Sequence, residues 1–290
     1  MTDLGTHMDV LSKEEVDHFW TQGYLRVPDV YAPDEVDELA EDLDVLIDRW
    51  AGSKPWTGPW REALLDADMA AKIELRGLHD LGYYSAAWAR ATGNAKLAGV
   101  LRCLLGPAVE LHHTTMHVKP PERGQPFPLH QDWPFYAHTD DRYVDVLVHL
   151  DDTSHENGEI CFLPGSHLGG PLQHVTVAGG TMCHPHLPTD QYQLADTTPV
   201  PARRGDVVCF NINTIHGSYL NTTSEPRRLV RMGYRHPENA QLGGQAMGRP
   251  GVMVVGTRPA GKVRSRTRRT PEATSRWRSS QDWFVELVLS

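Results

Sequence analysis

The sequence predicts a mainly β domain, a sandwich or a barrel, with a helical region at its N-terminal end. From residue 107 onward, short β-branched or alternating runs are separated by turn signals, with no helical pattern between them. Residues 11–105 instead show helical spacing. The 290 residues include 40% hydrophobic residues, 25 Gly and 21 Pro, which suits a turn-rich globular domain with a sizeable core.

The helical region is predicted from its start and stop signals. Ser12-Lys13-Glu14-Glu15 is a capping-box pattern before a helix that ends at Gly23. A short strand at 24–27, a helix from Pro33 to just before Gly52, and a helical region over 85–105, interrupted at Gly93-Asn94, follow. No apolar run approaches the roughly eighteen residues of a membrane span, so we expect no membrane partner.

The β region is predicted as five strands separated by Pro, Gly and Asn turns. The expected strands are Val109–Val118, Tyr143–Leu150, Glu159–Leu163, Asp206–Ile212 and Leu229–Tyr234. Residues 168–200 are expected to form a long loop that covers the barrel and the active site. We expect the helices and strands to share one core, as a single domain over 1–261 with a β core over about 107–236.

Charge and cysteine content narrow the function classes. The net charge is −9, while the basic Lys and Arg residues gather in 262–290, which is expected to be a mobile tail rather than a nucleic-acid arm. An acidic body disfavours nucleic acid as a partner. Four Cys without a CxxC pair argue against disulfides and thiolate zinc. With no signal-peptide pattern at Met1, we expect a cytoplasmic protein, monomeric or homodimeric.

The clearest candidate for chemistry is Leu129-His130-Gln131-Asp132-Trp133. If this segment is a strand, His130 and Asp132 lie two residues apart and project to the same face. With a third ligand on a neighbouring strand they would complete a 2-His-1-carboxylate triad, which leaves three metal positions open. A His–Asp pair can also arise by chance in a chain with 16 His.

A second candidate lies in residues 205–228. His216 follows an apolar strand, and Arg227 stands eleven residues later, at the start of the next strand. The guanidinium of Arg227 could hold a dicarboxylate through paired hydrogen bonds. Arg228 competes for this role, because alternation along a strand turns only one of the two inward.

These segments together resemble the phytanoyl-CoA dioxygenase family of Fe(II)- and 2-oxoglutarate-dependent oxygenases. The resemblance covers about residues 11–236 and rests on their order and spacing. Its segments are Leu11–Tyr31, Lys119-Pro120-Pro121, His130-Gln131-Asp132, Glu156-Asn157-Gly158, Leu163–His167, Gly205-Asp206, His216-Gly217-Ser218, Asn221 and Arg227-Arg228. The fold it implies is a double-stranded β-helix, a cupin-like jelly roll, backed by helices.

The resemblance implies site residues and cofactors. His130, Asp132 and His216 would bind Fe(II), and Arg227 would bind the distal carboxylate of 2-oxoglutarate. Thr115 and Lys72 are further co-substrate candidates. The implied enzyme is a dioxygenase that uses O2, releases succinate and CO2, and hydroxylates a small substrate in specialised metabolism. Related halogenases have Gly or Ala in place of the carboxylate, so Asp132 favours hydroxylation, or a desaturation or cyclisation variant.

The substrate pocket is the least constrained part of the prediction. Trp133, Phe135, Tyr136 and His138 follow the ligand pair and are expected to line a pocket for a hydrophobic or ring-containing substrate, or else to pack the barrel end. His112 and His113 are expected on opposite faces of their strand, because neighbouring positions alternate.

Two alternatives remain open from the sequence. One is a jelly-roll binding protein without catalytic activity, and the other is a mononuclear iron oxygenase that does not use 2-oxoglutarate. Arg227 separates the second alternative from the leading hypothesis.

Overall fold

The computed structural model describes residues 10–260; residues 1–9 and 261–290, the latter containing the predicted basic tail, lie outside the described part. The α-helices of the described part are α1 (Lys13–Gln22), α2 (Pro33–Trp50), α3 (Trp60–Leu64), α4 (Ala67–Lys72), α5 (Ala86–Ala91) and α6 (Ala95–Leu105). None of these helices is long and apolar enough to cross a membrane.

The described strands form a large sheet, a small sheet and a hairpin. The large sheet has the order β1-β11-β6-β13-β4-β3-β2, with β14 also paired to β4, and the small sheet has the order β10-β7-β12-β5. The strands are β1 (Tyr24–Val27), β2 (Gly52–Ser53), β3 (Arg76–His79), β4 (Val109–Lys119), β5 (Phe127–His130), β6 (Tyr143–His149), β7 (Ile160–Phe162), β8 (Val175–Ala178), β9 (Thr181–His186), β10 (Thr198–Pro199), β11 (Val207–Asn211), β12 (His216–Ser218), β13 (Arg227–Arg235) and β14 (Val252–Val255).

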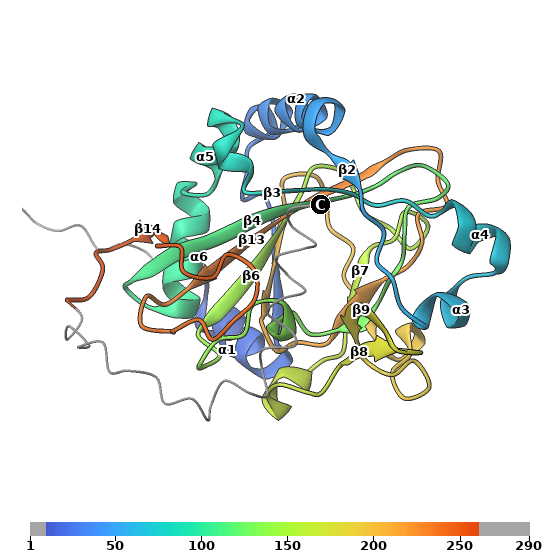
Figure 1. The fold of residues 1–290 in the computed structure, drawn as a ribbon. Coiled ribbons are helices and arrows are strands. Elements are labelled where there is room, and N and C mark those ends of the chain that lie inside the picture. The colour runs from blue at the N-terminus through green and yellow to red at the C-terminus, as the bar shows by residue number, and fades with distance from the viewer. Residues whose placement is uncertain (1–9, 261–290) are drawn as a thin grey trace, which may run out of the picture.

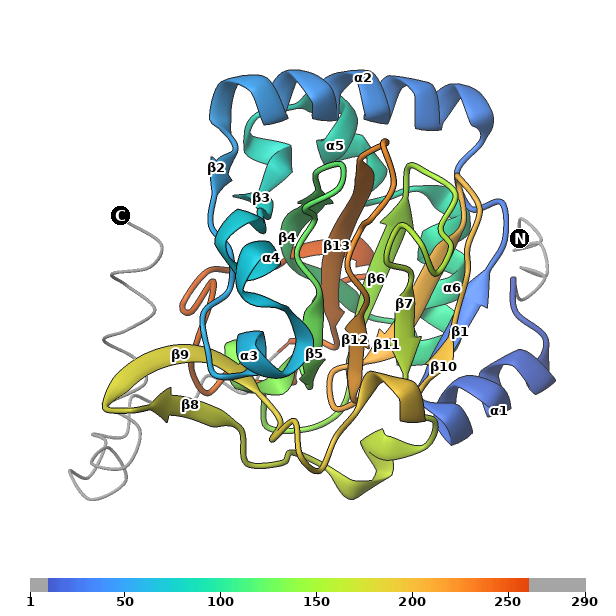
Figure 2. The same cartoon turned by 90° about the vertical axis from the view of Figure 1, so that its right-hand side faces the viewer.

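The two sheets face each other, and helices cover the other side of the large sheet. Figure 1 shows α5 and α6 on one side of β4, β13 and β6, with β7 on the opposite side. Figure 2 shows β5, β12 and β7 side by side in front of the large sheet. Leu147 of β6, Phe162 of β7 and Phe210 of β11 pack together in the space between the sheets. This sandwich is the architecture expected of a jelly roll.

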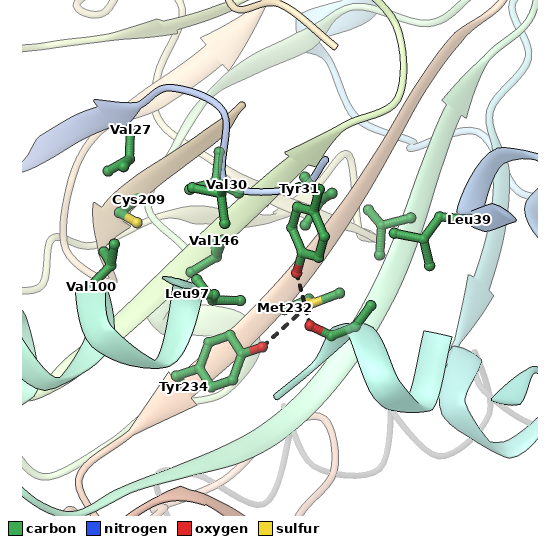
Figure 3. Packing of buried hydrophobic residues seen from close by; sticks show 14 of the residues in the cluster. Val27, Val30, Tyr31, Leu39, Leu97, Val100, Val146, Cys209, Met232 and Tyr234 are labelled. Carbon is green, nitrogen blue, oxygen red and sulfur yellow. Dashed lines mark hydrogen bonds between the residues drawn. The ribbon is translucent and has the colours of Figure 1, made fainter. Parts of the chain in front are cut away.

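The main apolar core lies between the large sheet and the helices (Figure 3). Val230, Met232 and Tyr234 of β13 point into it, because every second residue of a strand faces the same side. The Tyr234 hydroxyl donates to the carbonyl of Thr92 at 2.8 Å, and the hydroxyl of Tyr31 donates to the carbonyl of Ala91 at 2.8 Å. These bonds satisfy two polar groups inside an otherwise apolar layer.

The end of α1 is fixed against the barrel by a glycine. Gly23 has a left-handed φ of 88°, and a Cβ at this position would lie 2.5 Å from Nδ1 of His167 and 2.6 Å from Oγ1 of Thr214. Only glycine fits both the backbone conformation and this close approach. At the other end, Ser12 and Glu15 form the predicted capping box.

The predicted fold is confirmed, and the missed helices and strands are short, with two to six residues each. The expected helices match α1, α2, α5 and α6, and the five expected strands match β4, β6, β7, β11 and β13 within one or two residues. The stretch 52–79 holds α3, α4, β2 and β3, which were not predicted. Residues 168–200 are not a plain loop, since they contain the β8–β9 hairpin and β10.

Candidate metal centre and its cavity

Three buried side chains converge between the two sheets. His130 ends β5 and His216 begins β12, and the two residues are direct cross-strand partners with ring centroids 4.2 Å apart. The Oδ1 atom of Asp132 lies 3.6 Å from Nε2 of His130 and 3.8 Å from Nε2 of His216. All three side chains are buried, and one donor atom of each lies within 4.8 Å of the others. Such a cluster is a candidate metal site.

The strand-alternation argument for Asp132 is wrong, although its conclusion is correct. β5 ends at His130, and Asp132 already has helical dihedrals of −79° and −19° at the start of a 3-10 turn over Trp133–Phe135. The side chains of His130 and Asp132 therefore meet because the chain turns after the strand, and not because they alternate along it.

Both histidines are held in the tautomer that suits a metal ligand. Nδ1 of His130 lies 2.8 Å from the carbonyl of Pro128, and Nδ1 of His216 lies 3.0 Å from the carbonyl of Thr214. A carbonyl oxygen only accepts, so each Nδ1–H donates and each Nε2 carries a lone pair toward the space between the ring and Asp132, where a metal would lie. Burial lowers the pKa of His216 to about 3, so this ring is neutral and able to coordinate a cation.

The charge of Asp132 suits the same role. Burial alone would raise the pKa of this carboxyl, but the charge of Arg231 holds it well below its ordinary value. Two neutral imidazoles and one carboxylate, without a thiolate, form a donor set that suits Fe(II). The three residues predicted from the sequence thus meet in the structure with geometry and charge that fit the metal.

A cavity of about 520 Å³ opens beside the three donors. Exposed aromatic side chains of Trp50, Tyr83 and Tyr84 stand on its rim. Further inside, Trp56 packs edge-on against His130 with ring centroids 4.9 Å apart and stacks on His184 at 5.4 Å. Most of these residues belong to 50–84, where Lys72 was the one candidate named from the sequence and where only the cluster of aromatic residues could have indicated a pocket wall.

Arg227 lines the cavity as a buried cation without a protein counterion. Its side chain is 1% exposed, and it has no hydrogen bond or ion pair within residues 10–260. Burial lowers the pKa of Arg227 to about 9, and the charge of Asp151 offsets only part of this fall, as expected for a buried cation without a contacting counterion. Lys119 is the cross-strand partner of Arg227, and its Nζ donates to Oγ of Ser218, another lining residue, at 2.8 Å. This end of the cavity is therefore built to receive an anion.

Arg228 has the opposite orientation. Its guanidinium lies outside the cavity, with Nη2 2.7 Å from Asp151 and Nη1 3.0 Å from Asp44. Of the two arginines, Arg227 is therefore the one that lines the cavity. Ser218 and Lys119 were missed as site residues, although both belong to segments that carried the family resemblance.

The two other co-substrate candidates, Thr115 and Lys72, lie in different parts of the structure. Thr115 lines the cavity, and its Oγ1 is 2.9 Å from Nδ1 of His79. Lys72 is an exposed residue at the end of α4 and is not among the residues that line the cavity. The structure thus keeps Thr115 as a candidate and gives Lys72 no contact with the cavity.

Of the four predicted pocket residues, only Phe135 lines the cavity. The Tyr136 hydroxyl donates to Oδ2 of Asp132 at 2.5 Å. His138 pairs with Arg235 through Nε2 at 2.9 Å, and Trp133 donates from its indole to the carbonyl of His138 at 3.2 Å. The pocket prediction is corrected for Trp133, Tyr136 and His138, which do not line the cavity.

The expectation that His112 and His113 face opposite sides is also wrong. The pairing of β4 with β13 shifts register at this point, so that Gly233 pairs with His113 and Tyr234 with Leu111. This irregularity leaves His112 as an extra residue in β4. Its Nδ1 lies 2.9 Å from Nδ1 of His113 and 2.9 Å from the hydroxyl of Tyr143, so the two imidazoles lie together in one buried polar group.

Comparisons with known proteins agree with this geometry. The model of the phytanoyl-CoA dioxygenase family matches residues 19–229. A probable alpha-ketoglutarate-dependent hypophosphite dioxygenase of Stutzerimonas stutzeri is 29% identical over 224 residues, which cover 76% of this chain and 77% of the relative. The ectoine dioxygenase of Sphingopyxis alaskensis is 27% identical over 253 residues, with 79% and 77% coverage.

Solved structures share the fold. The non-heme alpha ketoglutarate dependent carbocyclase SnoK from nogalamycin biosynthesis superposes with a TM-score of 0.66 at 21% identity, covering 84% of this chain and 92% of that one. EctD from S. alaskensis with 2-oxoglutarate and 5-hydroxyectoine gives a TM-score of 0.62 at 24% identity, with 84% of each chain covered.

Proposed function

The chain belongs to the phytanoyl-CoA dioxygenase family and is an Fe(II)- and 2-oxoglutarate-dependent dioxygenase, and we propose that it hydroxylates an unactivated C–H bond of a small organic substrate, with release of succinate and CO2. One observation supports this proposal most strongly. The His130, Asp132 and His216 donors and the counterion-free Arg227 lie in the same cavity.

Each half of the cavity has a separate task. His130, Asp132 and His216 would hold the iron, which when bound supplies the O2 chemistry that couples decarboxylation of 2-oxoglutarate to oxidation of the substrate. Arg227 would pair with the distal carboxylate of the co-substrate, and that pairing would relieve the cost of its buried charge. Ser218 accepts its hydrogen bond from Lys119, so its own hydroxyl hydrogen is free to donate to the same carboxylate.

The remainder of the cavity would orient the substrate and exclude water. Trp56, Phe127 and Phe135 line this part together with polar side chains of β4. Aromatic walls of this kind suit an organic substrate with apolar or ring surface better than a small inorganic anion. This favours an organic substrate over hypophosphite, the anion in the name of the Stutzerimonas relative.

The fold comparisons and the free cysteines support a proposal for the cellular role. The solved structures that share the fold include proteins of nogalamycin biosynthesis, and we place this enzyme in specialised metabolism. Its four cysteines carry free thiols, which supports the reducing environment of the cytoplasm.

The test is an anaerobic Fe(II) titration followed by a substrate screen. Wild-type protein should bind Fe(II) and then 2-oxoglutarate with a visible charge-transfer band. His130→Ala and Asp132→Ala should lose the band, since each removes a ligand; unchanged Fe(II) binding in both variants would contradict the site.

A screen of candidate organic substrates by succinate release should then find one whose turnover is stoichiometric with a hydroxylated product. Succinate release that is stoichiometric with a desaturated or cyclised product would contradict hydroxylation.

A further inference from the structure

The two oxygens of Asp132 have different partners. Oδ1 faces Nε2 of both ligand histidines, at 3.6 and 3.8 Å. Oδ2 is turned away from them and accepts hydrogen bonds from the hydroxyl of Tyr136 at 2.5 Å and from Nη1 of Arg231 at 2.9 Å. Only one oxygen of this carboxylate is therefore directed at the metal position.

Arg231 is fixed in place by groups on several elements. It is 6% exposed and lies on the same face of β13 as Arg227. Nη1 also donates to Oδ1 of Asp145 on β6 at 3.1 Å, and Nη2 donates to Nε2 of His113 on β4 at 3.1 Å. The guanidinium lies over the ring of Tyr136, 4.9 Å from its centroid. A cation held from so many sides gives its hydrogen-bond partners little freedom to turn.

We propose that Arg231 and Tyr136 are positioning residues that keep Asp132 a one-oxygen ligand of the iron. A carboxylate can bind a metal through one oxygen or through both. Binding through both oxygens would take one of the three positions that the triad leaves open, and 2-oxoglutarate and O2 need all three. By holding Oδ2, Arg231 and Tyr136 preserve that position. This inference rests on the proposed function.

Two variants remove the hold on Oδ2 in different ways. Tyr136→Phe deletes one hydroxyl, which lies 2.5 Å from Oδ2 of Asp132 and 2.9 Å from Oδ2 of Asp145. It leaves the Arg231–Asp145 ion pair intact, so no buried charge loses its counterion. Arg231→Lys keeps the positive charge but replaces the planar group that bonds several partners at once. The matched control is Arg228→Lys, on the same strand, where Arg228 is likewise paired with two aspartates but lies outside the cavity.

The experiment measures metal and co-substrate binding under anaerobic conditions. We expect Tyr136→Phe and Arg231→Lys to weaken 2-oxoglutarate binding by the Fe(II)-loaded protein about tenfold to a hundredfold, the usual range for groups that orient metal ligands, because a released Asp132 can take a position that the co-substrate needs. The visible spectrum of the Co(II)-substituted protein with 2-oxoglutarate should also change, because it reports the number of ligands. Arg228→Lys should match the wild type in both measurements.

The outcomes separate this inference from the proposed function. If the wild type binds neither Fe(II) nor 2-oxoglutarate, the proposed function fails. If the wild type binds both, and Tyr136→Phe and Arg231→Lys keep its 2-oxoglutarate affinity within twofold and its Co(II) spectrum, the positioning role is wrong. Should Arg231→Lys not fold, Tyr136→Phe alone decides between these results.

Discussion

Strand β13 presents two different chemistries on its two faces. The face toward the helices carries Val230, Met232 and Tyr234, which belong to the main apolar core; Met232 and Tyr234 are labelled in Figure 3. The face toward the small sheet carries Arg227 and Arg231, both buried, in the wall of the cavity. Alternation along one strand thus separates stability from ligand binding, because apolar burial stabilises the fold whereas a buried cation opposes it.

The largest expected effect is a loss of folding stability in acid, caused by buried histidines of β4 and β6, the strands next to β13. Burial lowers the pKa of His149 to about 4 and that of His112 to about 2, and it holds the pKa of His113 well below its ordinary value. Since the unfolded chain takes up these protons first, near pH 6.5, stability is complete above that pH and is lost as the pH falls toward the folded values. His149 alone should contribute a loss of about 2 kcal/mol between pH 7 and pH 5.

Urea unfolding of the metal-free protein at the two pH values measures this loss. His149→Gln should shift less between pH 7 and pH 5 than the wild type does, because one titrating group is gone. Equal urea midpoints for the wild type at both pH values would contradict the conclusion that these buried histidines are neutral in the folded protein.

A smaller loss of stability is expected from a substitution on the face of β13 toward the helices. Met232→Ala should lower the free energy of unfolding by about 3 kcal/mol, because it leaves a cavity in the packed layer. The folded variant should bind Fe(II) and 2-oxoglutarate as the wild type does, and calorimetric titration checks this. A loss of co-substrate affinity in the folded variant would show that the two faces are not independent.

The smallest free-energy change is expected from Arg227→Ala. Unlike Met232→Ala, this variant should weaken ligand binding and leave the fold at least as stable as before. The affinity for 2-oxoglutarate should fall about a hundredfold, since two charge-assisted hydrogen bonds are lost. Stability without ligand should stay the same or rise, because a buried, uncompensated charge is removed. Arg228→Ala is the control and should leave co-substrate affinity unchanged; equal effects of the two variants would refute the inward assignment.

Strong local patterns predicted the fold, and spacing in the chain predicted the main site. The helix of Lys13–Gln22 has a capping box and a glycine stop, and His130, His216 and Arg227 stand at distances that carried the family resemblance. Elements of two to six residues over 52–79 were missed, because so few residues give no reliable periodicity.

The remaining errors have tertiary causes. The position of His112 depends on a register shift that alternation cannot reveal. The separation of Lys72 from the cavity depends on how the short α4 lies on the surface. Tyr136 and Arg231 act through contacts made across the fold, between residues 95 positions apart, so no local pattern could assign their role.

The placement of the site between the sheets has a mechanical consequence. His130 and His216 belong to the small sheet, and Asp132 directly follows one of its strands, whereas Arg227 belongs to the large sheet. A dicarboxylic acid bound as proposed, with one end at the three donors and the other at Arg227, would connect the two sheets through a single small molecule. Succinate is one carbon shorter than 2-oxoglutarate and lacks its keto group, so the product would connect the sheets less firmly than the co-substrate.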